Sequence, residues 1–88
     1  MDIKSWKIML AVDDYGSFTR VGAELGYTQS GITQTMKNLE KKVGFPLYIK
    51  DHHGITLTNE AKSLIPAIRT LLNADEVIHQ EIAALNGA

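Results

Sequence analysis

Apolar residues recur at helical intervals along most of this chain, and glycine or short polar residues separate one run from the next. The first run predicts a helix that starts at Ile3 and ends near Asp14, with these apolar residues: Ile3, Trp6, Ile8, Met9, Leu10 and Val12. A second helix is predicted from Phe18 to Leu25, because the Ser17 hydroxyl can cap its first turn and Gly26 can end it.

A third helix and a hairpin are predicted next. Thr28 can cap a helix that Gly44 ends, and its apolar residues lie on one face, four, three and four positions apart: Ile32, Met36, Leu39 and Val43. Two β-rich runs follow, Leu47 to Ile49 and Ile55 to Leu57, and the DHHG segment between them contains turn residues. Helices joined by a short turn and followed by a hairpin predict a mainly α winged helix-turn-helix, with three helices and a two-stranded wing.

A long last helix is predicted from Asn59 to Leu85, with Thr58 as its cap and Asn86-Gly87 closing it. Two rows of residues repeat along it at intervals of seven, and only one member is polar: Ala61, Ile68, Asp75 and Ile82, and Leu64, Leu71, Ile78 and Leu85. Such a stripe is typical of a coiled-coil-like seam between two chains. The alternative is that the helix lies along its own domain, although the other helices are too short to cover the whole stripe.

Composition restricts the class of protein. A chain of 88 residues with 44% hydrophobic residues predicts one small folded domain. Cysteine is absent, which excludes disulfides and thiolate metal sites. No apolar run approaches the roughly 18 residues of a membrane span, and the N-terminus lacks the features of a signal peptide. We therefore expect a cytoplasmic protein with no membrane partner.

Charge is unevenly distributed, although the net charge is only -1. From Tyr15 to Lys50 five basic residues and two acidic residues give +3, whereas from Asp51 to Ala88 two basic and five acidic residues give -3. The basic middle and the acidic tail are therefore expected to have different functions.

The front of the third predicted helix is unusually rich in short hydrogen-bonding side chains: Thr28, Gln29, Ser30, Thr33 and Gln34, together with Gly31. A recognition helix enters the major groove of DNA with this end. Glutamine can bond adenine at two atoms, and serine or threonine can bond several bases. Lysines further along such a helix suit the flanking phosphates. The alternative for this cluster is an ordinary solvated helix face.

The ordered motifs of the chain resemble the DNA-binding domain of LysR-type transcriptional regulators. These motifs are GSFT at Gly16 to Thr19, the pair Thr28-Gln29, Leu39-Glu40 followed by a Gly-x-Pro-Leu segment at Gly44 to Leu47, and Leu57-Thr58 before a helix that starts with Glu60-Ala61. Each motif is weak alone, but the ordered set is specific. The resemblance covers the chain from Ile3 through the long helix.

The resemblance implies a transcriptional regulator that binds double-stranded DNA as a homodimer, or as a tetramer in the intact protein. It implies a winged helix-turn-helix in residues 1–58 and a linker and dimerisation helix in residues 59–88. In the family a further C-terminal domain binds a small-molecule effector, and we expect this chain to be a fragment without that domain.

Site residues follow from the resemblance in the same way. It implies base contacts from Gln29, Ser30, Thr33 and Gln34, and phosphate contacts from Thr19, Thr28, Lys37 and Lys50. The wing, with His52 and His53, would approach the minor groove. The dimer interface would contain Leu64, Ile68, Leu71, Ile78, Ile82 and Leu85. Serine stands at position 30 where proline is frequent in the family, glutamine at 34 and histidine at the wing tip where arginine is frequent, so the preferred bases are expected to differ.

Other functions find less support in the sequence. The pair Asp13-Asp14 falls at a predicted helix end, where a solvated terminus is a simpler interpretation than a catalytic dyad. His52 and His53 are adjacent, and adjacent residues of a strand point to opposite faces, which argues against a shared metal. His79 is expected at the surface or packed in the interface. We therefore expect no enzyme, no catalytic residue, no metal and no cofactor. The main alternative is a winged-helix module that dimerises or binds proteins without specific DNA binding.

Overall fold

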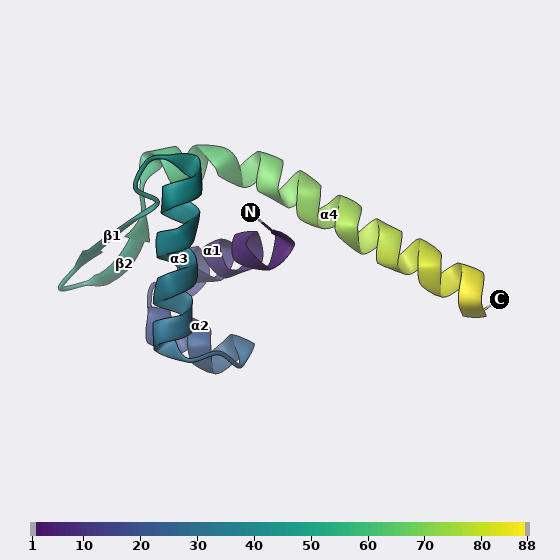
Figure 1. The fold of residues 1–88 in the computed structure, drawn as a ribbon, viewed down its shortest axis with the longest axis horizontal. Helices are drawn as coiled ribbons and strands as arrows, with labels where there is room; N and C mark the ends of the chain where they lie inside the picture. Colours follow the sequence, from purple (N-terminus) through teal and green to yellow (C-terminus); the bar gives the residue numbers. More distant parts are fainter. Residues whose placement is uncertain (1, 88) are drawn as a thin grey trace.

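Four helices and one two-stranded sheet make up the structure, a computed structural model that describes residues 2–87. In chain order these elements are α1 (Ile3–Tyr15), α2 (Phe18–Leu25), α3 (Gln29–Val43), β1 (Tyr48–Asp51), β2 (Gly54–Leu57) and α4 (Asn59–Gly87). The hairpin projects on one side of α3, and α4 extends far to the other side (Figure 1). The molecule is therefore elongated, with extents of 52 × 26 × 20 Å. This is the predicted winged helix-turn-helix followed by a long helix. Within the described residues no helix has both the length and the apolar character needed to cross a membrane.

Hydroxyl caps begin α2, α3 and α4 where the sequence predicts them. Ser17, Thr28 and Thr58 each accept a hydrogen bond from a backbone N–H in the first turn of the helix. The distances are 3.2 Å from Arg20 N, 3.0 Å from Gly31 N and 3.2 Å from Ala61 N. Because these bonds satisfy amides that lack a partner inside the helix, they fix the three starting points.

The ends of several elements differ slightly from the prediction. Helix α1 continues through Tyr15, and α4 continues through Gly87 instead of ending at Leu85. The Asn86 amide Nδ2 donates to the Ile82 carbonyl at 3.1 Å. Both strands of the wing lie closer to its tip than expected, because Asp51 pairs with Gly54 and only two residues remain for the turn.

Thirteen buried apolar residues form one core: Ile8, Met9, Val12, Phe18, Val21, Ile32, Met36, Leu39, Leu47, Ile55, Leu57, Ala61 and Ile68. Every helix and strand β2 contribute to this set, as does Leu47, which lies just before β1. The wing also contacts α2 through an edge-to-face pair between Phe18 and Tyr48, whose ring centroids are 5.0 Å apart. The hairpin is therefore packed on the helices at its base.

Helix α4 packs on its own domain along its first part only. Ile68 is just 4% exposed and lies in the core, so its own domain already covers most of its surface, and its place in a dimer interface stays a prediction. Leu64 is half-buried against the same core. Further along, Ile78, Ile82 and Leu85 are 57%, 50% and 83% exposed. The alternative that the helix lies along its own domain thus holds as far as Ile68, whereas Leu71, Ile78, Ile82 and Leu85 are exposed within residues 2–87.

Close packing of backbone against backbone positions the turn between α2 and α3. Gly22 is buried in α2, and a Cβ atom there would lie 2.6 Å from the carbonyl oxygen of Tyr27. The Tyr27 amide donates to the Gly22 carbonyl at 2.8 Å. Because any larger side chain would push the turn away, glycine at this position fixes where α3 starts.

Replacing Gly22 by alanine is expected to lower the free energy of unfolding by about 1–3 kcal/mol, because the added methyl group overlaps a backbone oxygen that cannot move alone. Urea denaturation followed by circular dichroism measures this change. Gly87→Ala is the matched control, since nothing lies within 4 Å of a Cβ at that position. A Gly22→Ala variant as stable as the original chain would contradict the packing argument.

Candidate nucleic-acid interface

Polar side chains cover the solvent face of the first turns of α3. Gln29, Ser30 and Gln34 are exposed, and Thr33 is half-buried. Ile32 and Met36 lie on the opposite face of the helix, within the core. The same helix therefore joins the domain through one face and presents the four predicted base-contacting residues on the other.

Hydrogen bonds one helical turn apart hold these side chains in place. The Gln29 amide Nε2 donates to Thr33 Oγ1 at 2.8 Å, and that hydroxyl donates to the Gln29 carbonyl oxygen at 3.1 Å. The Gln34 amide donates to Asn38 Oδ1 at 2.8 Å. Each amide NH₂ has two hydrogens, so each glutamine keeps a second donor and its side-chain oxygen for an outside partner. Asn38 was not predicted, although its spacing of four from Gln34 is the signal that could have identified it.

A depression of about 140 Å³ lies where α2, α3 and the wing meet. Its lining includes Thr19 near the start of α2, Gln29 at the start of α3 and Lys50 on β1. The positive end of the α2 dipole, a hydroxyl and an ammonium group together suit an anion such as a phosphate. The structure thus brings two predicted phosphate-contacting residues, Thr19 and Lys50, beside a predicted base-contacting residue.

The other two predicted phosphate contacts lie apart from this depression. Thr28 is exposed and caps α3, and its oxygen is 3.3 Å from Ser30 Oγ. Lys37 lies two turns along α3, where it lines a separate shallow depression with Lys41 and Pro46. Positive charge therefore extends along α3 beyond its polar front, the surface formed by Gln29, Ser30, Thr33 and Gln34.

The wing tip carries two exposed histidines whose rings contact each other at a tilt of 44°. His52 and His53 form the turn between the strands, and their ring centroids are 3.9 Å apart. The expectation that they point to opposite faces is therefore wrong, because turn residues do not alternate as strand residues do. The His53 amide donates to Asp51 Oδ1 at 2.8 Å, which stabilises this tight turn. Within the described part of the chain no three His, Asp or Glu side chains are grouped to hold a metal ion.

A family model described as bacterial regulatory helix-turn-helix protein, lysR family, matches residues 3–62. The chain belongs to the lysR family. The HTH-type transcriptional regulator CzcR of Bacillus cereus is 32% identical over 78 residues, which cover 88% of this chain and 27% of CzcR. The HTH-type transcriptional activator CmpR of Synechocystis sp. is 31% identical over 85 residues, which cover 97% of this chain and 28% of CmpR. The chain therefore spans little more than a quarter of the length of these curated relatives.

Solved structures of lysR-family proteins share this fold. The crystal structure of the CbnR_DBD–DNA complex superposes with a TM-score of 0.87 at 26% identity, covering 98% of this chain and 99% of that chain. The crystal structure of VV2_1132, a LysR family transcriptional regulator, gives a TM-score of 0.88 at 26% identity, covering 94% of this chain and 28% of that one. The likeness includes most of α4 as well as the winged domain.

In this lysR-family chain, motif residues in the last turns of α3 and in the segments on either side of the wing hold the base of the wing. The Glu40 carboxylate accepts the Leu47 amide at 2.8 Å. Thr58 donates its hydroxyl to the Pro46 carbonyl at 2.9 Å and its amide to the Leu47 carbonyl at 3.0 Å. Burial raises the pKa of the neighbouring Tyr48 phenol, and the negative charge of Glu40 adds to this shift. The motif residues Glu40, Pro46, Leu47 and Thr58 thus form one network that fixes the wing relative to α3.

Replacing Glu40 by alanine is expected to lower the free energy of unfolding by about 1–3 kcal/mol, because the part-buried Leu47 amide loses a charged acceptor. Glu40→Gln is the matched control, since its side-chain oxygen can still accept that bond, and it is expected to cost less. Guanidinium denaturation measures both variants. Equal stability of the two variants would show that the carboxylate is not holding the wing.

Proposed function

We propose that this chain is the sequence-specific DNA-binding domain of a LysR-type transcriptional regulator that acts in the cytoplasm. Residues 1–58 serve as the winged helix-turn-helix, and residues 59–88 serve as the linker and dimerisation helix. The polar front of α3, which is exposed while its opposite face is buried, is the observation that carries the proposal. The likeness to a domain that was solved in complex with DNA supports it. The intact protein would bind a small-molecule effector through a domain outside this chain.

On DNA, the N-terminal end of α3 enters the major groove and the wing approaches the minor groove. Gln29, Ser30, Thr33 and Gln34 contact base edges, and the internal hydrogen bonds of the two glutamines orient their amides for this purpose. Thr19 and Lys50 hold a phosphate in the depression beside α2. Lys37 and the Thr28 hydroxyl contact neighbouring phosphates. His52 and His53 at the wing tip lie near the minor groove.

Replacing Gln34 by alanine is expected to weaken binding at the preferred site by about 1–3 kcal/mol, because a bidentate base contact is lost. Binding to random DNA should change little, since phosphate contacts dominate it. Fluorescence anisotropy with a selected operator duplex and a random duplex of equal length measures both affinities.

Lys37→Ala is the control for the Gln34 variant. It is expected to weaken binding to both duplexes and to reduce the slope of log affinity against log salt concentration by about one. Equal losses on both duplexes for Gln34→Ala would contradict base contact. Absence of any binding by the original chain at low salt would favour the alternative, a protein-interaction module, which its net charge of -1 allows.

Dimerisation is proposed through the uncovered part of the α4 stripe. Leu71 is 43% exposed, and Ile78, Ile82 and Leu85 extend the same stripe beyond the domain. Half-buried Leu64 extends it towards the core, with Trp6 beside it in a shallow apolar groove of about 170 Å³. Leaving apolar surface in water costs about 25 cal/mol per Å², and a second copy of the helix can cover it. A two-fold dimer would present two α3 helices to a palindromic site, and the intact protein could assemble further into a tetramer.

The double substitution Leu71→Glu and Ile78→Glu is expected to give a monomer with weak operator binding, because two carboxylates would lie inside the seam. Asn73→Glu with Gln80→Glu is the matched control, which adds the same charge on the other side of the helix. Sedimentation equilibrium gives the oligomeric state of each. A monomeric original chain at high concentration, or a dimer that survives the first double substitution, would exclude this interface.

A further inference from the structure

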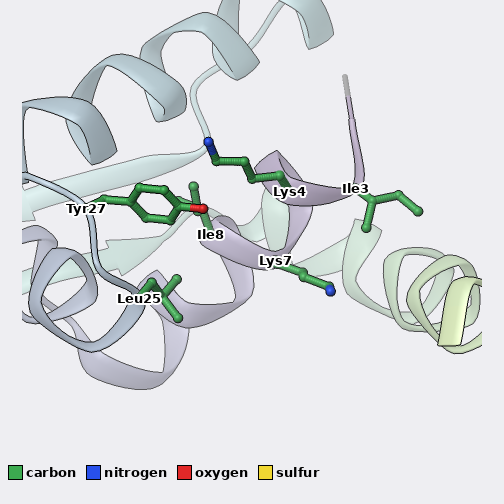
Figure 2. Close-up of a pocket in the computed structure, with 6 residues that line it drawn as sticks. All are labelled: Ile3, Lys4, Lys7, Ile8, Leu25 and Tyr27. Carbon is green, nitrogen blue, oxygen red and sulfur yellow. The ribbon is translucent and has the colours of Figure 1, made fainter. Parts of the chain in front are cut away.

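A second exposed apolar surface lies far from the wing, where the N-terminal half of α1 meets the end of α2. It is a groove of about 390 Å³ lined by Ile3, Lys4, Lys7, Ile8, Leu25 and Tyr27 (Figure 2). Leu25 is 41% and Tyr27 is 40% exposed. Within the described residues, the large hydrophobics with comparable exposure are Ile49 on the wing and members of α4. This groove, defined here as the α1–α2 groove, is therefore separate from the α4 stripe.

Two lysines border the apolar floor of the groove. Lys4 Nζ lies 4.5 Å from the centroid of the Tyr27 ring, a cation–π contact, whereas Lys7 extends from α1 in a different direction (Figure 2). Neither lysine lies within ion-pair distance of a carboxylate among residues 2–87. Hydrogen bonds from Ser5 lower the pKa of the Asp2 carboxyl, and the charge of Lys4 adds a smaller contribution. The nearby Asp2 carboxylate accepts the Ser5 amide and hydroxyl at 2.8 and 2.7 Å as the cap of α1. The groove thus combines apolar surface with two cations that are not ion-paired.

The groove is not needed for the DNA contacts proposed above. Those contacts come from the start of α2, the front of α3 and the wing, whereas Leu25 is the last residue of α2 and Ile3, Lys4 and Lys7 belong to α1. The side chain of Tyr27 lies against Lys4 rather than with the base-contacting residues. A molecule could therefore bind in the α1–α2 groove while α3 is bound to DNA.

We propose that the α1–α2 groove binds an acidic amphipathic segment of another protein, with apolar side chains on Ile8, Leu25 and Tyr27 and carboxylates beside Lys4 and Lys7. The apolar floor supplies the desolvated centre that strong protein contacts need. The cations favour a partner of opposite charge and disfavour basic ones. Because Leu25 and Tyr27 belong to the helix-turn-helix itself, such a partner would be held beside the DNA site.

The probe is a fluorescein-labelled synthetic peptide in which leucine and phenylalanine recur at helical spacing among aspartates and glutamates. Two control peptides replace its apolar residues by serine or its acidic residues by lysine. Titration into the ¹⁵N-labelled chain, followed by NMR, is expected to shift the amides of Lys4, Lys7, Ile8, Leu25 and Tyr27. Neither control peptide is expected to produce these shifts.

The decisive comparison is between two charge-reversed variants. The double variant Lys4→Glu with Lys7→Glu is expected to bind the peptide about tenfold more weakly, since each exposed ion pair contributes up to about 1 kcal/mol. Lys37→Glu with Lys50→Glu makes the same change of charge on the proposed DNA face and is expected to leave the peptide affinity unchanged. Leu25→Ser removes part of the floor without changing charge and is expected to weaken binding with the fold retained by circular dichroism.

Several outcomes would overturn the proposal. In one such outcome, the amide shifts are confined to the front of α3 and the wing, and the Lys37 and Lys50 variant binds the peptide more weakly than the Lys4 and Lys7 variant. This would show that the acidic peptide binds the DNA face in place of DNA. Shifts along α4 would assign the peptide to the dimer stripe. A change from dimer to monomer in the Lys4 and Lys7 variant would show that a second copy of this chain occupies the groove.

Discussion

The backbone of α2 lies directly against the turn that precedes α3, and the position of the whole polar front depends on this contact. With no side chain at Gly22, the Tyr27 carbonyl oxygen comes within 2.6 Å of where a Cβ would be. A similar approach fixes the wing, because a Cβ at Gly54 would lie 2.7 Å from the Gly16 carbonyl oxygen, which accepts the Ile55 amide at 2.9 Å. Both elements proposed to contact DNA are thus placed by backbone contacts at the two ends of α2.

The base and the tip of the wing are held by different contacts. Glu40 and Thr58 tie the segment before β1 to α3 and α4 by hydrogen bonds in partly buried surroundings. At the other end, His52 and His53 are exposed and contact each other. On α3, Gln29 and Gln34 already bond to side chains one turn away. Binding of bases would therefore add to or exchange existing bonds, so that fewer rotamers need to be fixed on binding.

A small core explains why so much apolar surface remains outside it. One set of thirteen residues from all four helices, the wing strand and the adjoining loop makes up the core, and Ala61 and Ile68 are the contributions of α4. Beyond Leu72 the helix extends away from the domain, and among residues 2–87 the side chains of Ile78, Ile82 and Leu85 are outside the core and largely exposed. The groove at Leu25 and Tyr27 lies elsewhere, between the first half of α1 and the end of α2. These surfaces suit two separate partners.

Local patterns in the sequence were sufficient to predict the helices and strands, since caps and helix periodicity depend on residues that are neighbours in the chain. Ser17, Thr28 and Thr58 cap as predicted, and Ile32, Met36 and Leu39 face the core as their spacing requires. The polar front of α3 could be recognised in the same way. Other features could not be predicted, because each depends on how separate or irregular segments come together. These are the contact between the His52 and His53 rings, the depression that Thr19 and Lys50 both line, and the burial of Ile68. A seven-residue repeat indicates that a helix face is apolar, but only the tertiary structure decides which part of that face its own domain covers and which part stays exposed.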